Sequence, residues 1–304
     1  MKALVTGAGG FCGRHLSPYL ETHGVEVHAL SSRAGTSIRH HWVPDTTDVA
    51  ALTEVVGSVR PDFVFHLAGV SHSADPSLFY RINVEYGVAV LFALERAGLP
   101  DRPVLLAGSS AEYGMVSERQ LPIREDLPPF PYNHYGISKL AQTLEGLSAS
   151  RKNRPIVIVR PFNIVGAGMP EHLVVQSFSR QITDIMKGQI PPVIEVGNLG
   201  SVRDFIDVKD VVRIYWKLIQ TPSSYGEVVN VCSGKGISIH DMLRKLIERS
   251  GMTIEVRAVP SRFKAIDVPL HYGSREKLER ILGNMPVTGL DEMLRSVLEG
   301  LTGQ

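Results

Sequence analysis

The sequence has 304 residues, of which 43% are hydrophobic and 21% are charged, an ordinary composition for a globular protein with a large core. Its formal net charge of +1 gives no reason to expect a nucleic-acid or membrane surface, so a small-molecule partner is the default expectation. No apolar run approaches the roughly 18 residues of a membrane span and no signal-peptide pattern is present, which favours a cytoplasmic protein.

Strand-like and helical patterns alternate over the first two-thirds of the chain. Amphipathic runs at 48–59 and 78–98 predict helices between short apolar runs. Nearly continuous hydrophobicity is typical of strands buried on both faces, and it occurs in KALVTG (2–7), VEVHAL (25–30), DFVFHLAG (62–69), PVLLAGSS (103–110) and PIVIVRPFN (155–163). We therefore predict an α/β protein with a Rossmann-type, doubly wound parallel sheet.

The alternation loosens after residue 163. We predict a cofactor-binding Rossmann domain over 1–163, to which the chain returns at about 205–232. The remainder, 164–304, is predicted to form mainly a smaller α/β domain that binds the substrate. A proline-rich segment at 121–133 is interpreted as an ordered loop that covers part of the protein.

The first strand runs into a glycine-rich turn and then a helix. Gly7, Gly10 and Gly13 permit a tight turn, close approach of backbone N–H groups to a pyrophosphate, and close packing of helix on strand. The pattern indicates a dinucleotide site, and the alternative is a merely tight strand–helix turn.

The end of the second strand carries hydroxyls and a cation where NAD-binding proteins usually have an acidic residue. Ser31, Ser32 and Arg33 stand there, and Arg14 follows the last motif glycine. These groups would bind a 2′-phosphate, which favours NADP(H) over NAD(H). Either arginine could instead be a solvated surface residue.

Tyr135 and Lys139 are four residues apart at the start of a helical pattern, which places them on one face. A neighbouring ammonium stabilises a phenolate, so we expect Lys139 to lower the pKa of Tyr135 toward neutrality. The serines of PVLLAGSS end a neighbouring strand, where a hydroxyl can bind a substrate oxygen beside the phenol. Without this context the pair would be read as a surface pair.

The chain resembles the extended short-chain dehydrogenases/reductases that modify nucleotide sugars, within the NAD-dependent epimerase/dehydratase superfamily. The motifs that carry this resemblance are TGAGGFCG (6–13), HLAG (66–69), GSSAEYG (108–114), YGISK (135–139), RPFNIVGAG (160–168) and VGNLGSVRDFIDVKD (196–210). The resemblance implies that Ser109, Tyr135 and Lys139 are catalytic, with Tyr135 transferring a proton at the sugar oxygen and Lys139 holding the nicotinamide ribose.

The same resemblance implies two further sets of contacts. For the cofactor it implies Gly7, Gly10, Phe11, Cys12, Gly13, Arg14, Ser32, Arg33, Asp45, Thr46, Leu67, Ala68, Gly69, Tyr135 and Lys139. For the nucleotide sugar it implies Ser110, Asn163, Val174, Asn198, Arg203 and Lys264. Asp45 could instead be a turn or N-cap aspartate, and Arg203 could instead pair structurally with Asp204 or Asp207. From residues alone, Cys12 and Cys232 are interpreted as small core residues, and no residue pattern indicates a metal.

Within the family the chain most resembles GDP-4-keto-6-deoxy-D-mannose reductases and next GDP-mannose 4,6-dehydratases. In the dehydratases a glutamate stands two residues after the catalytic Ser or Thr, and here that position is Ala111. Glu112 is adjacent, but a one-residue slip turns a side chain to the other side of an extended segment.

The expected activity is therefore NADPH-dependent 4-ketoreduction of a GDP-linked 4-keto-6-deoxyhexose to GDP-D-rhamnose or GDP-6-deoxytalose. The alternatives are a dehydratase or epimerase with tightly bound NADP, or a catalytically silent cofactor-binding protein. Related enzymes have an arginine near the sugar site of the C-terminal domain. Lys264 stands at the corresponding position and Arg262 stands two residues before it, so either could contact the diphosphate. By analogy with the family, a homodimer is expected through the helices at 78–98 and near Tyr135.

Overall fold

A computed structural model of the protein describes residues 1–35, 37, 39–263 and 268–302. Its largest element is a seven-stranded sheet in the order β10-β6-β5-β4-β1-β2-β3, with every neighbouring pair parallel. The strands are β1 (Lys2–Thr6), β2 (Glu26–Ser31), β3 (His40–Trp42), β4 (Phe63–His66), β5 (Val104–Ala107), β6 (Ile156–Pro161) and β10 (Val228–Val231). The doubly wound parallel sheet predicted from the sequence is confirmed.

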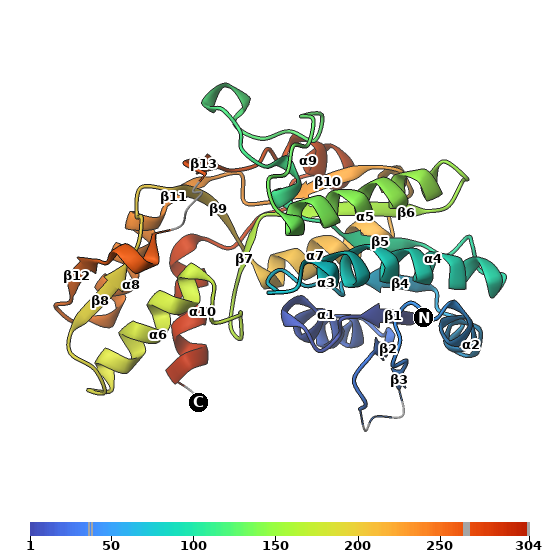
Figure 1. The fold of residues 1–304 in the computed structure, drawn as a ribbon, viewed down its shortest axis with the longest axis horizontal. Helices are drawn as coiled ribbons and strands as arrows, with labels where there is room; N and C mark the ends of the chain where they lie inside the picture. Colours follow the sequence, from blue (N-terminus) through green and yellow to red (C-terminus); the bar gives the residue numbers. More distant parts are fainter. Residues whose placement is uncertain (36, 38, 264–267, 303–304) are drawn as a thin grey trace.

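Helices cover both faces of this sheet, and each face has its own apolar core (Figure 1). One layer contains α1 (Phe11–Thr22), α7 (Val208–Ile219) and α9 (Glu276–Leu282). The other contains α2 (Val49–Val59), α3 (Pro76–Tyr80), α4 (Tyr86–Arg96) and α5 (His134–Ser150). Because the strand order reverses between β1 and β4, a ligand crevice is expected at their carboxyl ends.

The helix predicted over 78–98 is interrupted by a π-helical turn, Arg81–Glu85, between α3 and α4. This turn directs Asn83 into the interior, where its amide donates to the carbonyl of Val70 and to Ser138 Oγ. From Pro76 to Arg96 the run reaches the length and apolarity of a membrane span, contrary to the expectation from the sequence. Half of its most apolar window is buried inside the protein, as in a helix that covers a sheet.

A second unit lies at one end of the large sheet (Figure 1). Its small sheet has the order β11-β9-β13 with β7 also paired to β9, and a separate parallel pair joins β12 to β8. The strands are β7 (Asn163–Val165), β8 (Val193–Val196), β9 (Val202–Asp207), β11 (Gly236–Ser238), β12 (Glu255–Ala258) and β13 (Leu270–His271). A third apolar core lies under α6 (Val174–Met186), α8 (Ile239–Ser250) and α10 (Leu290–Thr302).

Short 3-10 helices complete the chain, and the proline-rich loop is ordered as expected. The 3-10 helices are Ser110–Tyr113, Glu118–Gln120, Pro222–Ser224 and Pro260–Arg262. In the proline-rich loop, Ile123 is fully buried and its backbone pairs with the segment that follows β13, while Tyr132 reaches the cavity described below.

Candidate active site

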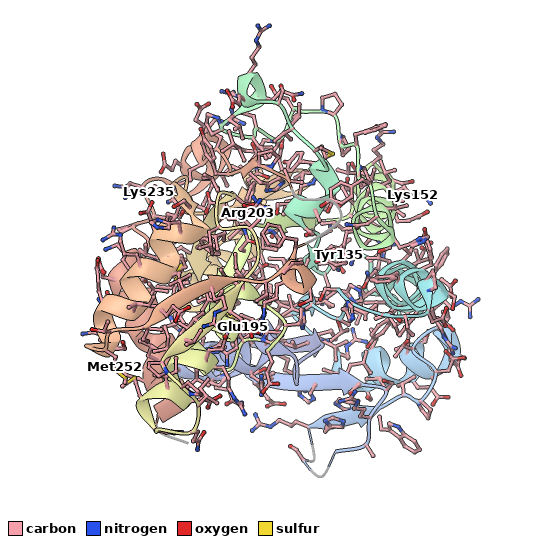
Figure 2. The ribbon with its side chains drawn as sticks, turned by 60° about the vertical axis from the view of Figure 1, so that its left-hand side comes forward. Tyr135, Lys152, Glu195, Arg203, Lys235 and Met252 are labelled. Atoms are coloured by element: carbon pink, nitrogen blue, oxygen red, sulfur yellow. The ribbon has the colours of Figure 1, made fainter. Side chains whose placement is uncertain are left out.

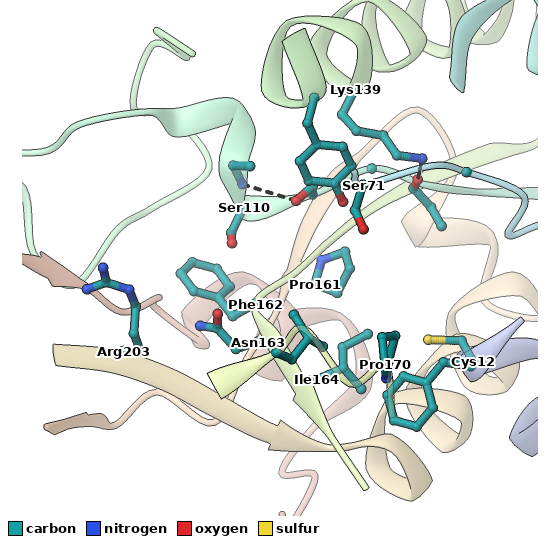
Figure 3. A pocket seen from close by; sticks show the side chains of 18 of the residues that line it. Cys12, Ser71, Ser110, Lys139, Pro161, Phe162, Asn163, Ile164, Pro170 and Arg203 are labelled. Atoms are coloured by element: carbon teal, nitrogen blue, oxygen red, sulfur yellow. Dashed lines mark hydrogen bonds between the residues drawn. The ribbon is translucent and has the colours of Figure 1, made fainter. Parts of the chain in front are cut away.

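A cavity of about 490 Å³ opens where the carboxyl ends of β4 and β5 face the small sheet. Figure 2 shows Tyr135 and Arg203 toward the middle of the molecule, whereas Lys152 and Met252 lie at its periphery. In Figure 3, Lys139 and Ser110 lie on one side of the cavity and Asn163 and Arg203 on the other. The cavity therefore brings together residues far apart in the sequence.

The glycine-rich turn has the geometry that the sequence predicts. Gly7 has φ of +70°, a left-handed conformation that favours glycine. A Cβ at Gly13 would lie 2.3 Å from the Gly7 carbonyl oxygen, so only glycine permits this packing of α1 on the turn. Gly10 is the N-cap of α1, and no atom of the described residues lies within 4 Å of a Cβ built at Gly9. This open cradle at a helix N-terminus fits a pyrophosphate.

The two arginines predicted near the cofactor ribose have different surroundings. Ser32 and Arg33 are exposed just after β2, where the Arg33 backbone is held by Ser31 Oγ and by His40 Nε2. Arg14 instead donates from Nη2 to the carbonyl oxygen of Gly168, 3.0 Å away. Arg33 thus lies at the end of β2, and Arg14 reaches across to the loop after β7.

Asp45 adopts the turn arrangement left open by the sequence. Its Oδ1 accepts from the backbone N–H and the hydroxyl of Thr47, and Arg81 Nη2 lies 3.3 Å away. These hydrogen bonds lower the pKa of Asp45, the side-chain bond to Thr47 most. Thr46 beside it is buried.

The segment after β4 approaches both the glycine turn and the cavity. A Cβ built at Gly7 would lie 2.7 Å from the backbone nitrogen of Ala68, so the two turns are in close contact. Leu67 and Gly69 line the cavity, as do Phe11 and Cys12 at the start of α1. Cys12 is only partly buried, whereas Cys232 is a core residue. Among the described residues, no cluster of three His, Cys, Asp or Glu side chains could hold a metal.

Ser109, Ala111, Tyr135 and Lys139 line one side of the cavity, which we call the catalytic wall. Ser109 follows β5 as the N-cap of a 3-10 helix, and its Oγ accepts from the Ala111 N–H, 3.1 Å away. Tyr135 lies near the start of α5 and lines the same side of the cavity. The predicted oxygen-binding hydroxyl and the phenol therefore lie on the same side of the cavity.

The expected lowering of the Tyr135 pKa is wrong for this structure. Burial raises the pKa of the phenol, and the hydrogen bond with Ser109 only opposes that shift. The ammonium of Lys139 donates instead to the Ala107 carbonyl oxygen at 2.8 Å and to Gln142 Oε1 at 3.0 Å. Lys139 is 4% exposed, and burial lowers its pKa to about 8.

Glu112 points away from the cavity, behind the catalytic wall. One carboxylate oxygen accepts from the Ser109 N–H at 2.8 Å, and the other from Arg160 Nε at 2.7 Å. Both side chains of this ion pair are buried, and the guanidinium lies 4.6 Å from the ring centre of Tyr113. Glu112 therefore holds the turn that carries Ser109.

Asn163, Arg203, Phe205 and His271 line the opposite side of the cavity, which we call the sugar wall. Asn163 pairs with Phe205 and Arg203 pairs with His271 in parallel register, so residues of β7, β9 and β13 share one face. Val174, at the start of α6, lines the same cavity. Arg203 donates to the carbonyl oxygens of Val202 and Pro269.

Asp204 and Asp207, the alternative partners considered for Arg203, are held by other groups. Asp204 accepts from Ser233 and from the backbone of Gly234 and Gly273, and Asp207 caps α7. Burial raises the pKa of Asp204 to about 6. Its carboxylate joins β9 to the segments that follow β10 and β13.

Of the residues predicted to contact the sugar, one is not among those that line the cavity and another cannot be placed. Asn198 lies in the turn before β9, where its Oδ1 accepts from the Gly200 N–H, and it is not among the lining residues. Lys264 lies outside the described residues. Arg262 forms an ion pair with Glu195 at 3.6 Å, away from the cavity lining.

His271 and Ser71 line the cavity although the sequence analysis did not single them out. His271 is 8% exposed, packs on the Phe162 ring at 5.3 Å, and burial lowers its pKa to about 4. A strand of two residues is too short to show an alternating pattern in the sequence. The position of His271 at the cavity becomes visible only when β13 is paired with β9 in the structure.

A sequence profile described as NAD dependent epimerase/dehydratase family matches residues 3–232. A GDP-6-deoxy-D-mannose reductase of Pseudomonas aeruginosa is 31% identical, covering 98% of this chain and 96% of its own. A GDP-6-deoxy-D-talose 4-dehydrogenase of Aggregatibacter actinomycetemcomitans is 31% identical, covering 93% and 92%. The solved structure of RMD from P. aeruginosa complexed with NADPH is 29% identical, covers 99% of both chains and superposes with a TM-score of 0.87. GDP-mannose 4,6-dehydratases and UDP-glucose 4-epimerases occur among weaker matches.

Proposed function

The chain belongs to the NAD dependent epimerase/dehydratase family, and from this premise we propose that it is an NADPH-dependent 4-ketoreductase of a GDP-linked 4-keto-6-deoxyhexose. The observation that carries the proposal is the combination of Ser109, Tyr135 and Lys139 on one wall with Ala111 beside them. The names of two relatives, each 31% identical, support the GDP-sugar substrate.

The cradle at residues 7–13 fits a dinucleotide, because Gly13 lets α1 pack directly on the turn and the space beside Gly9 is open. We assign the pyrophosphate to the backbone of this turn, including Phe11 and Cys12, and the adenosine 2′-phosphate to Ser32 and Arg33. Arg14, directed at Gly168, has weaker support. Asp45 with Thr46 would face the adenine, and Leu67 to Gly69 would line the nicotinamide side. The NADPH of a neighbouring structure supports this choice of cofactor.

The chemistry assigned to this chain is proton transfer at the ketone oxygen. NADPH, when bound, supplies a hydride to the sugar carbonyl. Tyr135 donates its phenolic proton to the oxygen as negative charge develops there, and its raised pKa keeps it protonated at neutral pH. Ser109, on the same side of the cavity, holds the same oxygen through its hydroxyl. Lys139 presents a buried positive charge that stabilises the phenolate left behind.

Ala111 distinguishes this reaction from dehydration. Elimination of water needs a further acid–base group to remove one carbon-bound proton and deliver another. Ala111 lines the cavity without such a group, and both oxygens of Glu112 are held by Ser109 and Arg160. Ketone reduction needs neither group, so the geometry favours the reductase over the dehydratase.

We assign the sugar and its diphosphate to the side of the cavity facing Tyr135. Ser110 and Asn163 would contact the sugar, Val174 would pack on it, and Arg203 would face the diphosphate. The division into a cofactor domain (1–163, with the return at 205–232) and a mainly sugar-binding domain (164–304) belongs to the same proposal.

We propose a homodimer through α5 and the helical run Pro76–Arg96, which contains α3 and α4. Leu78 and Phe92 are 38% and 52% exposed on one helical run, and Ile137 and Leu144 are 40% and 57% exposed on α5. Exposed apolar side chains on two adjacent helices are typical of an interface.

We also propose that the protein is cytoplasmic. Two free cysteines are consistent with a reducing compartment.

The test is incubation with GDP-4-keto-6-deoxymannose and NADPH, with the product identified by NMR. We expect NADPH oxidation and formation of GDP-rhamnose or GDP-6-deoxytalose. Conversion of GDP-mannose or another parent sugar without net cofactor consumption would identify a lyase or isomerase instead. No turnover on any NDP-4-ketosugar of a panel would contradict the proposal.

A further inference from the structure

The ammonium of Lys139 is held from inside its own helix by Gln142. Lys139 Nζ donates to Gln142 Oε1 at 3.0 Å and to the Ala107 carbonyl oxygen at 2.8 Å. An ammonium has three N–H donors, so these two bonds leave one donor for other partners. The orientation of the Gln142 amide therefore helps to decide where that donor points.

The other end of this amide is unpartnered in the interior. Gln142 Nε2 and His66 Nε2 are both buried and have no hydrogen-bond partner among the described residues. Both lie beside Gly87 in α4, because a Cβ built there would be 3.3 Å from His66 Nε2 and 3.6 Å from Gln142 Nε2. Buried polar groups of this kind are usually satisfied by an ordered water.

The second ring nitrogen of His66, Nδ1, contacts a hydroxyl group. His66 Nδ1 lies 2.9 Å from Thr6 Oγ1, which also accepts from the Ala68 N–H at 3.2 Å. Burial, and then the charge of Lys139, lower the pKa of His66 to about 3, so the ring is neutral. We assign the proton of the neutral ring to Nδ1, which then donates to Thr6 Oγ1, and this assignment makes His66 Nε2 an acceptor.

We propose that Gln142 and His66 are positioning residues for Lys139, joined by one buried water over Gly87 that accepts from Gln142 Nε2 and donates to His66 Nε2. The water keeps the amide nitrogen of Gln142 toward the interior and its oxygen toward the ammonium. The remaining donor of Lys139 is then directed to the cavity. The proposal rests on the proposed function only for the catalytic role of Lys139.

The charge balance around Lys139 makes the proposal testable. The titratable groups that interact with its charge are His66 from β4 and Glu112, which is paired with Arg160. Tyr135 lies four residues before it on the same helix. Gln142→Glu puts a carboxylate against the ammonium and raises the pKa of Lys139. Gln142→Leu removes the acceptor at nearly the same volume and lowers that pKa further.

The first experiment measures NADPH affinity by fluorescence as a function of pH, which requires no turnover. Affinity is expected to fall as Lys139 loses its proton, with an alkaline midpoint that moves up by roughly one pH unit in Gln142→Glu and down in Gln142→Leu. The alkaline limb of kcat should move in the same directions. Midpoints that move together, or not at all, would overturn the proposal, because a merely structural role gives no opposite shifts.

Gly87→Ala is designed to displace the water without changing either polar side chain. We expect it to move the alkaline midpoint in the same direction as Gln142→Leu. The matched control is Gly57→Ala in α2, where no atom of the described residues lies within 4 Å of the added methyl, and it should leave the midpoint unchanged. Equal behaviour of the two alanine variants would contradict the proposed water.

A high-resolution crystal structure supplies a readout that is independent of the substrate. We expect a water within hydrogen-bond distance of His66 Nε2 and Gln142 Nε2. A dry site, or a Gln142 amide turned with its oxygen toward His66, would overturn the proposal. If the GDP-sugar activity fails instead, the water and the NADPH midpoints still decide this inference separately.

Discussion

The two walls of the cavity are built in different ways. The catalytic wall comes from strand ends and a helix start within one parallel sheet, and its polar groups are held by buried partners such as Glu112, Gln142 and Ala107. The sugar wall comes from three short strands separated by up to about a hundred residues, with Arg203 directed by backbone carbonyls. Under the proposed function, the first wall carries the chemistry and the second selects the substrate.

The largest effect is expected on the catalytic wall from Tyr135→Phe. Removal of the proton donor should lower kcat by roughly 10²–10⁴-fold. Because the phenyl ring still fills the same space, NADPH affinity and thermal stability should change little. Stopped-flow NADPH oxidation with the 4-ketosugar checks this. A variant with near-normal kcat would show that the wall does not carry the chemistry.

Glu112→Gln should break the support behind the same wall. It leaves the guanidinium of Arg160 buried without its partner charge, which should cost about 3–5 kcal/mol in the free energy of unfolding. Urea denaturation checks this, with the exposed Glu118→Gln in the neighbouring turn as the control. Equal stability of the two variants would mean that the pair contributes no more than a surface charge.

On the sugar wall, Arg203→Ala should raise KM without a matching loss of kcat. Loss of one charge-assisted contact to a diphosphate is expected to cost roughly tenfold, about 1.4 kcal/mol. Arg262→Ala, outside the cavity lining, is the matched control. A large fall in kcat with unchanged KM would place Arg203 among the chemical groups and remove the distinction between the walls.

The smallest effect is a pH dependence of stability from His66, behind the catalytic wall. Its folded-state pKa, about 3, lies below its unfolded value, so unfolding takes up a proton and stability falls as pH falls from about 6.5 toward 3. Between pH 6.5 and 5.5 the loss from this group should be about 1 kcal/mol. Denaturant titrations of His66→Gln should show a correspondingly shallower dependence. Parallel pH dependences in the two proteins would contradict a neutral buried His66.

The residues that come together on the catalytic wall could be named from the sequence because the information that places them is local. The glycines at 7, 10 and 13 and the Tyr135–Lys139 spacing encode geometry within one turn, and the structure places these residues as expected. What local spacing could not supply is the competition for the ammonium of Lys139. Gln142 and the carbonyl of Ala107 hold that ammonium, while burial raises the pKa of Tyr135.

The sugar wall was predicted less completely because its register is set by long-range pairing. Asn163 and Arg203 were identified, but His271 enters the cavity only because β13 pairs with β9 at Arg203. The π-helical turn at Arg81–Glu85 was also missed, since an inserted residue in a helix has no signal in an apolar pattern. Asn198 was expected at the sugar because it belongs to a family motif, but it lies in a turn, where its side chain accepts from the Gly200 N–H.

The account is tested most directly by isotope transfer with NADPH deuterated on its reactive face. Reduction of GDP-4-keto-6-deoxymannose is predicted to place one deuterium at C4 of the sugar. The same reaction with unlabelled NADPH in D₂O is predicted to leave C5 and C6 unlabelled, because Ala111 supplies no acid–base side chain to exchange those protons. Solvent deuterium at C5 or C6, or recovery of sugar without deuterium at C4, would contradict a 4-ketoreductase.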